Sequence, residues 1–293
     1  FSGEKINSTE SRAVLHTALR ASENQKILVN KKDIIPEIKS VKEKMKLFTT
    51  SVLNGNYKGF KGDKITDVVN IGIGGSDLGP SMVVESLSHY KTDLNTYFIS
   101  NVDGDHLNEV LSKVNPETTI FIIVSKTFTT IETLTNANSV RSWFLKSASE
   151  NDISKHFIAV SSNVEKAIEY GISSENIFPM WDWVGGRFSL WSSVGLSISL
   201  SIGYEKFHEL LEGARNMDLH FRNNEFSENI PVLMACLSLW YNNFFNYQTH
   251  AIIPYSENLK SFSKYLQQAS MESNGKQSDR SDNLVNYETG QIV

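Results

Sequence analysis

The chain has 293 residues, enough for about two domains of ordinary size, and its 40% hydrophobic and 21% charged residues are typical of a globular protein. The net charge of −5 argues against a nucleic-acid surface, which needs clustered lysine and arginine. The most apolar stretch, residues 230–245, is interrupted by Ser238, Asn242 and Asn243 and falls short of the roughly 20 apolar residues that span a bilayer. We therefore expect a soluble protein that contacts neither nucleic acid nor membrane.

The two ends and the single cysteine add further expectations. Residues 1–5 lack the charged-then-apolar pattern of a signal peptide. Because the chain begins with Phe and ends on the apolar pair Ile292-Val293, we expect a fragment of a longer protein. Cys236 has no disulfide partner, which fits a reducing cytoplasm, and its position in the apolar run 231–240 predicts a buried side chain.

From residue 66 onward, short β-branched runs alternate with helical stretches. The pattern predicts strands at residues 68–73, 96–100, 119–124 and 156–160, with helices over residues 81–88, 107–113, 131–146 and 164–170. Nearly continuous apolar strands that alternate with helices are typical of a parallel sheet covered on both faces. The predicted fold class is therefore α/β, a doubly wound parallel sheet flanked by helices, whose ligands bind beyond the carboxyl ends of the strands.

The second half of the chain changes character. Helices are expected over residues 192–201, 207–220, 231–245 and 259–271, with one short strand at 250–253 and a polar loop at 273–289. One strand does not make a sheet, so a second α/β domain starts here without finishing. We predict an N-terminal helical segment (1–50), a first α/β domain (51–205) and the start of a second one (206–293).

A glycine-rich turn, Gly72-Ile73-Gly74-Gly75-Ser76-Asp77, follows the first predicted strand. A dinucleotide fingerprint needs glycine at the sixth place, where Asp77 stands, so that interpretation fails. What remains is a flexible turn that lets main-chain N–H groups approach a ligand, with Ser76 as an extra donor. A tight strand-to-helix turn without a ligand is an equally good alternative.

The segment Ser125-Lys126-Thr127-Phe128-Thr129-Thr130 follows the third predicted strand. Thr129 and Glu132 have the spacing of a capping box, which predicts that a helix begins here. The N–H groups of its first turn carry partial positive charge, and the hydroxyls of Ser125, Thr127 and Thr130 with the Lys126 ammonium would add donors. Phosphate needs that arrangement, and without the Walker pattern a phosphate monoester is favoured. An ordinary helix cap explains Thr129 but not four hydroxyls in six residues.

Two charged residues lie beside flexible backbone. Arg187 follows Gly185 and Gly186, which suits stabilisation of developing negative charge, although these residues alone favour a structural salt bridge. Glu272 ends a predicted helix four residues after Gln268, so the two share a helical face. A carboxylate there suits a general base, but solvated glutamates are common in such places. None of the seven histidines has a second one at helical ligand spacing, so no metal site is indicated.

Together these stretches resemble the phosphoglucose isomerase family. The motifs stand in family order across almost the whole chain and are specific to this family, beyond its wider sugar-isomerase (SIS) fold. The resemblance implies an SIS-type αβα sandwich, with the phosphate-binding loop in a first SIS domain over residues 51–205 and an incomplete second one over 206–293. The matching residues are 3–7, 12–16, 72–80, 125–130, 185–189 and 271–276.

The resemblance implies an aldose-ketose isomerase of glycolysis and gluconeogenesis. It would interconvert glucose 6-phosphate and fructose 6-phosphate through a cis-enediol, without metal or organic cofactor, as a cytoplasmic homodimer. Arg187 would stabilise the enediolate with the Gly186 backbone near it, and Glu272 would move the proton between C1 and C2, with Gln268 nearby. The residues implied at the phosphate are Ser125, Lys126, Thr127 and Thr130, with Gly75 and Ser76 beside them.

The family also has segments that this sequence lacks. These are an N-terminal helical segment, a later segment with the ring-opening histidine, which comes from the partner subunit, and a lysine-bearing segment near the C-terminus. We therefore expect little or no activity on the closed sugar from this stretch alone. Two alternatives keep the same sheet. A sugar-phosphate-binding regulator would not need Arg187 or Glu272, and an aminosugar isomerase domain leaves both motifs unexplained.

Overall fold

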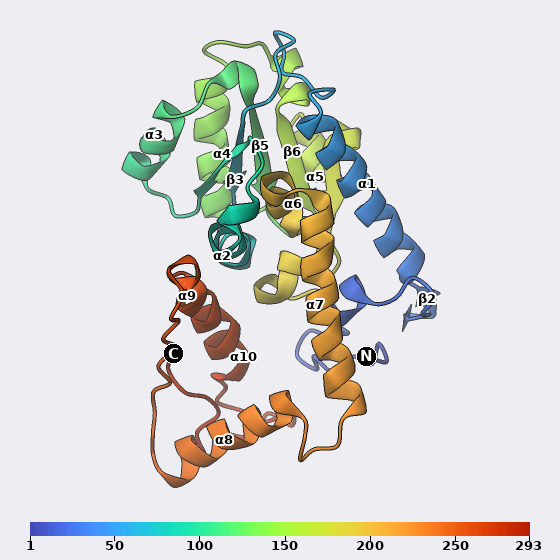
Figure 1. Ribbon diagram of the computed structural model, residues 1–293, viewed down its shortest axis with the longest axis vertical. Helices are drawn as coiled ribbons and strands as arrows, with labels where there is room; N and C mark the ends of the chain where they lie inside the picture. The colour runs from blue at the N-terminus through green and yellow to red at the C-terminus, as the bar shows by residue number, and fades with distance from the viewer.

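A five-stranded parallel sheet forms the centre of the computed structural model, which describes residues 1–293 (Figure 1). Its strand order is β4-β3-β5-β6-β7. Every residue of β3, β5 and β6 is buried or nearly so, as expected for strands covered on both faces. The four strands predicted from the sequence are confirmed to within two residues. The strands span Asp67–Ile71 (β3), Asn95–Ile99 (β4), Thr119–Val124 (β5), Phe157–Ser161 (β6) and Ile177–Pro179 (β7).

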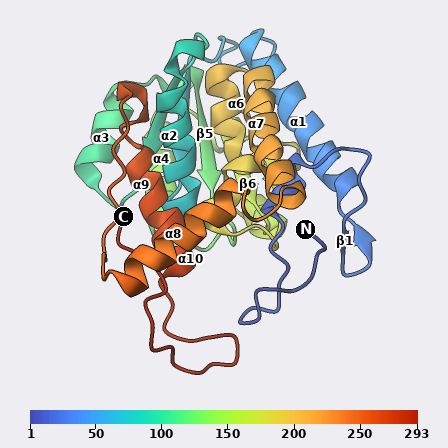
Figure 2. The same ribbon diagram turned by 60° about the horizontal axis from the view of Figure 1, so that its bottom comes forward.

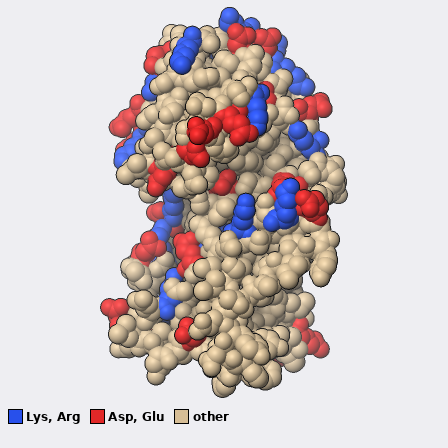
Figure 3. Space-filling view, turned by 90° about the vertical axis from the view of Figure 1, so that its left-hand side faces the viewer, with Lys and Arg blue, Asp and Glu red and all other residues tan.

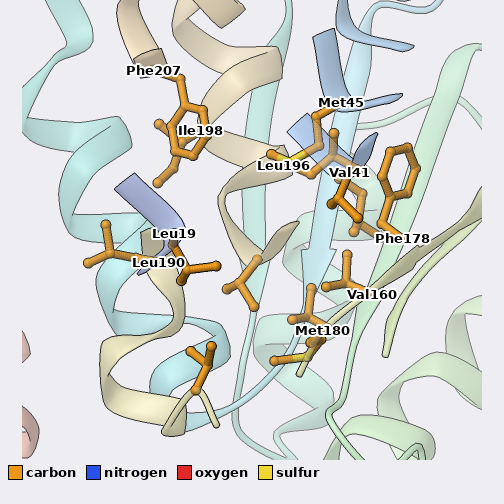
Figure 4. Close-up of a cluster of buried hydrophobic side chains, with 14 of the residues drawn as sticks. Leu19, Val41, Met45, Val160, Phe178, Met180, Leu190, Leu196, Ile198 and Phe207 are labelled. Atoms are coloured by element: carbon orange, nitrogen blue, oxygen red, sulfur yellow. The ribbon is translucent and has the colours of Figure 1, made fainter. Parts of the chain in front are cut away.

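Helices cover both faces of this sheet. Side chains of β5 alternate between two cores: Ile120, Ile122 and Val124 belong to one, and Phe121 and Ile123 to the other. Figure 4 shows part of the first core, where sheet residues such as Val160 and Phe178 pack with residues of α1 and α6. The predicted doubly wound α/β class is confirmed. The first layer contains α1 (Ile35–Leu53), α2 (Leu78–Ser86), α6 (Leu196–Ile202) and α7 (Tyr204–Asn223); the second contains α3 (Gly104–Ser112), α4 (Ile131–Phe144) and α5 (Val164–Glu169).

The chain leaves the neighbouring strands β3 and β5 toward opposite faces of the sheet. Helix α2 follows β3 and joins the first layer, whereas α4 follows β5 and joins the second. Such a switch point opens a crevice beyond the carboxyl ends of the strands, where ligands of doubly wound sheets bind. The glycine-rich turn after β3 and the hydroxyl-rich loop after β5 therefore lie on either side of this switch point.

The later helices lead away from the sheet and then return to it. Helix α7 extends toward α8 (Ile230–Phe244), and the chain comes back as α9 (Phe262–Leu266), a π-helical turn (Gln267–Met271) and α10 (Glu272–Asn274) (Figures 1 and 2). The start of α9 is held to α2, because Ser261 donates a hydrogen bond to the Glu85 carboxylate and Lys260 lies 3.0 Å from it. The helix predicted over residues 259–271 is thus present but divided.

Some sequence-based expectations differ from the structure. The strand predicted at residues 250–253 does not form; the pairing found there is one isolated parallel bridge between Thr249 and Ile292. A strand needs a run of neighbouring extended backbone to satisfy its N–H and C=O groups, and one bridge does not supply it. The short strand β7 and the antiparallel pair β1 (Leu28–Val29) and β2 (Lys32–Asp33) were missed, because so few residues show no period.

The predicted burial of Cys236 is wrong: its side chain is exposed on α8. Much of this helix is apolar yet faces solvent, with Met234, Trp240 and Phe244 exposed by 60%, 52% and 78%. Figure 3 shows that the lower part of the molecule, where α8 lies, carries few charged side chains. An apolar run predicts burial only where another element packs on each side of the helix, and here α8 is covered on one side, where Asn242 is buried.

The proposed division into residues 1–50, 51–205 and 206–293 stays a prediction. Helix α1 continues past the first boundary to Leu53, and α7 begins at Tyr204, next to the second. No helix combines the length and the apolar character needed to cross a bilayer.

Candidate active site

The glycine-rich turn after β3 touches the backbone of the segment that carries Arg187. A Cβ placed on Gly75 would lie 2.7 Å from the Arg187 backbone nitrogen and closer still to the Gly186 carbonyl. Only glycine permits this approach. Ser189 lies between the two backbones, because its hydroxyl donates to the Gly186 carbonyl at 2.6 Å and lies 3.4 Å from the Gly75 carbonyl. Asn70 on β3 holds the turn by donating to the Ser76 carbonyl at 3.0 Å. Sequence reasoning missed both supporting residues.

The hydroxyl-rich loop after β5 curls around a buried aromatic ring. Phe128 has a φ of +53° and its side chain is buried in the second core, so the residues around it form a tight turn. The hydroxyl of Ser125 donates to that of Thr130 at 3.2 Å, and the Thr127 and Thr129 hydroxyls lie 2.6 Å apart. The predicted phosphate ligands Ser125, Thr127 and Thr130 are thus gathered on one turn.

The predicted capping box at Thr129 and Glu132 does not form. Helix α4 begins at Ile131, so Thr130 is the N-cap residue, and no side chain caps the helix. The cap falls one residue later than predicted, because Thr129 bonds to Thr127 instead of turning toward the helix. The first N–H groups of α4 therefore lack a side-chain acceptor and remain available for an anion.

Lys126 connects the hydroxyl-rich loop to the segment that leads to Arg187. Its Nζ donates to the carbonyl oxygens of Asp182 at 3.1 Å and Val184 at 3.2 Å, both in the segment that leads to Arg187. Burial lowers the pKa of this ammonium, and the nearby Arg12 guanidinium adds to the effect. The ammonium thus binds the segment before Arg187 through two carbonyls. It also lies at the loop where the sequence predicts a phosphate contact.

Arg187 and Glu272 form an ion pair across 85 residues of sequence. Nη1 of Arg187 lies 3.0 Å from the Glu272 carboxylate, and Nε donates to the Ser273 hydroxyl at 2.7 Å. Gln268, on the π-helical turn before Glu272, points its amide toward Gly74, because a Cβ on that glycine would lie 3.1 Å from the amide nitrogen. The C-terminal segment thus brings a carboxylate and an amide to the glycine-rich turn. Sequence reasoning missed Ser273, for which only its position next to Glu272 gives a signal.

The pair stays accessible to solvent. The Arg187 side chain is 22% exposed and that of Glu272 is 52% exposed. A half-exposed carboxylate beside a guanidinium can exchange protons with a bound molecule, while the guanidinium can stabilise a nearby oxyanion. No group of three or more His, Cys, Asp and Glu side chains is arranged to hold a metal ion.

The strand order, the covered faces and the hydroxyl-rich loop at the switch point define a doubly wound α/β sandwich of the phosphosugar-isomerase type. The model of the phosphoglucose isomerase family matches residues 1–293, and the chain belongs to that family.

Relatives of known sequence and structure agree with this membership. The chain is 59% identical over its whole length to a glucose-6-phosphate isomerase from Christiangramia forsetii, of which it covers 54%. A crystal structure of a glucose-6-phosphate isomerase from Chlamydia trachomatis matches 97% of this chain and 53% of that protein, with a TM-score of 0.87 and 35% identity. A Thermus thermophilus protein of unassigned function shares the fold, with a TM-score of 0.71 over 88% of this chain and 57% of that one, at 24% identity. The chain spans about half the length of the relatives that it matches.

Proposed function

We propose that this chain is the phosphate-binding and proton-transferring part of an aldose-ketose isomerase. The enzyme interconverts glucose 6-phosphate and fructose 6-phosphate through a cis-enediol, in glycolysis and gluconeogenesis. The observation that carries the proposal is the ion pair of Arg187 and Glu272, 3.0 Å apart and next to the glycine-rich turn. Membership of the phosphoglucose isomerase family supports the choice of substrate.

The phosphate end of the sugar binds at the loop after β5. The hydroxyls of Ser125, Thr127 and Thr130 and the uncapped N–H groups of α4 donate to its oxygens, and Lys126 adds a positive charge beside them. Gly75 and Ser76 contact the ligand from the neighbouring turn. Binding energy gained at the phosphate orients the reacting carbons, which lie several bonds away.

The proton transfer takes place at the ion pair. The Glu272 carboxylate takes the proton from C2 of the open aldose, the electron pair of that C–H bond forms the C1–C2 double bond, and the C1 oxygen becomes the enediolate oxyanion. Arg187 stabilises this oxyanion, with the Gly186 backbone near it and Gln268 beside the carboxylate. The hydroxyl proton on O2 then passes to the O1 oxyanion, which moves the negative charge to O2. Glu272 delivers its proton to C1 while the electron pair on O2 forms the ketone C=O and the C1–C2 double bond becomes single. While Glu272 is neutral, the Arg187 charge is no longer matched by its carboxylate and acts on the enediolate instead.

We further propose that the enzyme is a cytoplasmic homodimer, and that ring opening depends on a histidine outside this stretch. Both proposals rest on the family resemblance. The division into an N-terminal helical segment and two SIS domains, the second incomplete here, belongs to the same proposal.

The test is Glu272→Gln in the full-length protein, with Glu225→Gln, an exposed glutamate in a loop, as the matched control. The expected result is a loss of turnover of about 10²- to 10⁴-fold, with binding of fructose 6-phosphate retained. Near-normal turnover would reject Glu272 as the base. A wild-type protein that binds the phosphosugar without turning it over would instead support a non-catalytic regulator.

A further inference from the structure

Arg187 is held by a neighbour that the proposed mechanism does not use. Its Nε donates to the Ser273 hydroxyl at 2.7 Å, and its Nη1 contacts Glu272 at 3.0 Å. The Ser273 hydroxyl in turn donates its proton to the Ala269 carbonyl one helical turn earlier. That second bond fixes the direction of the hydroxyl, so its oxygen is free to accept from Arg187.

We propose that Ser273 is a positioning residue that keeps Arg187 aimed at the enediolate during proton transfer. This inference rests on the proposed function of the Arg187–Glu272 pair. Once Glu272 has taken the proton from the sugar, its attraction for the guanidinium weakens. The Ser273 bond does not depend on that proton, so it persists when the carboxylate contact is lost.

A hydroxyl suits this task better than a second carboxylate. It accepts a hydrogen bond from the guanidinium without neutralising its charge, so the charge stays available to the oxyanion. The other neighbour of the guanidinium is also uncharged: Arg187 lies 5.2 Å from the centre of the Phe188 ring. Ser273 and Phe188 are thus two uncharged neighbours of the cation, and Glu272 is its only anionic partner within ion-pairing distance.

The competing explanation is that Ser273 only stabilises its own helix, since a serine hydroxyl often bonds to the carbonyl four residues earlier. Two ligands separate these explanations. A phosphorylated hydroxamate has a planar anionic end that mimics the enediolate, whereas a hexitol 6-phosphate offers the same phosphate without an oxyanion. A residue that acts through Arg187 matters for the first ligand only.

The variants to compare in the full-length protein are Ser273→Thr and Ser273→Val, which differ only by a hydroxyl against a methyl group. Ser273→Val is expected to weaken hydroxamate binding about tenfold or more relative to Ser273→Thr, because a hydrogen bond to a charged group is lost. The affinities of Ser273→Thr and Ser273→Val for hexitol 6-phosphate should agree within about twofold. Ser270→Ala, a serine of the same helical segment that is not a hydrogen-bond partner of Arg187, is the control for both ligands.

A second measurement keeps the outcome decisive if Ser273→Val also disturbs the helix. With Arg187→Ala already present, exchanging threonine for valine at position 273 should have no further effect on hydroxamate binding. The positioning role would be overturned if Ser273→Val weakened the binding of both ligands equally. It would also be overturned if the exchange of threonine for valine weakened hydroxamate binding as much in the Arg187→Ala background as in the wild type. If the wild-type protein binds both ligands but Ser273→Thr and Ser273→Val bind the hydroxamate equally well, this inference is wrong and the proposed function is unaffected. A wild-type protein that binds neither would overturn the proposed function and this inference with it.

Discussion

Replacing Gly75 with alanine tests how the two halves of the site are fitted together. The added Cβ would lie 2.7 Å from the Arg187 backbone nitrogen and closer still to the Gly186 carbonyl, whereas ordinary contacts begin at 3.4 Å. The two segments must therefore separate by at least about 0.7 Å at the nitrogen, and further at the carbonyl. Gly75 does not occupy the left-handed region, so the contact alone produces the effect.

The expected cost is about 1 to 3 kcal/mol of unfolding free energy, because overpacking against backbone forces main-chain shifts. In the full-length protein, of which relatives suggest this chain is about half, that corresponds to a fall in Tm of about 1 to 3 °C. A displacement of the guanidinium by about 1 Å should also lower turnover about 100-fold, while phosphate binding at the loop after β5 is retained. Thermal unfolding, steady-state kinetics and phosphosugar binding of the full-length variant measure the three quantities.

The control for stability is Gly186→Ala, on the other side of the same contact. A Cβ on Gly186 meets no atom within 4 Å, so the Tm of Gly186→Ala should equal or slightly exceed that of the wild type. If Gly75→Ala kept the wild-type Tm and turnover, or if Gly186→Ala lost as much stability, the reasoning from backbone contact would be refuted.

Three further predictions concern stability. Burial lowers the pKa of His16 from 6.5 to about 4, so between these pH values the unfolded chain binds a proton that the folded chain does not. The free energy of unfolding should therefore fall as the pH drops from 6.5 to 4. His16→Phe should reduce the corresponding fall in Tm when Tm is measured against pH. Asp218→Ala should cost about 3 kcal/mol in urea unfolding, because it leaves the Arg20 guanidinium, which is only 6% exposed, without its carboxylate; a loss below about 1 kcal/mol would contradict this. Gly213→Ala, in the exposed interior of α7 with nothing within 4 Å of the new Cβ, should raise the unfolding free energy by about 0.5 to 1 kcal/mol; a destabilised variant would show that the position is constrained.

The sheet was predictable from the sequence because its strands are buried on both faces. The strand Thr119–Val124 is continuously apolar after Thr119, and it begins and ends where the sequence predicts. The same reasoning failed at Cys236 on α8, since an apolar helix side is buried only if another element lies against it. It also failed at residues 250–253, because pairing depends on a partner that local sequence does not specify.

The candidate site was predictable in its residue types but not in its connections. The hydroxyls after β5 and the glycines at 75 and 186 follow from local chemistry, and the structure brings each set together. Arg187 contacts Ser273, which lies 86 positions away in the sequence. Lys126 contacts the carbonyls before Arg187, which lie more than 50 positions away. Contacts of that separation depend on tertiary packing, which no local spacing encodes.

The distance in sequence between Arg187 and Glu272 has a consequence for the order of folding. The phosphate loop closes within six residues of β5, so it can form as soon as the central strands pair. The ion pair closes a loop of 85 residues, so it cannot form until α7, α8 and α9 have packed. Closing this loop costs more chain entropy than closing the short phosphate loop, and that cost comes before the contacts that offset it. A refolding chain should therefore regain its affinity for a sugar phosphate before its preference for the enediolate mimic.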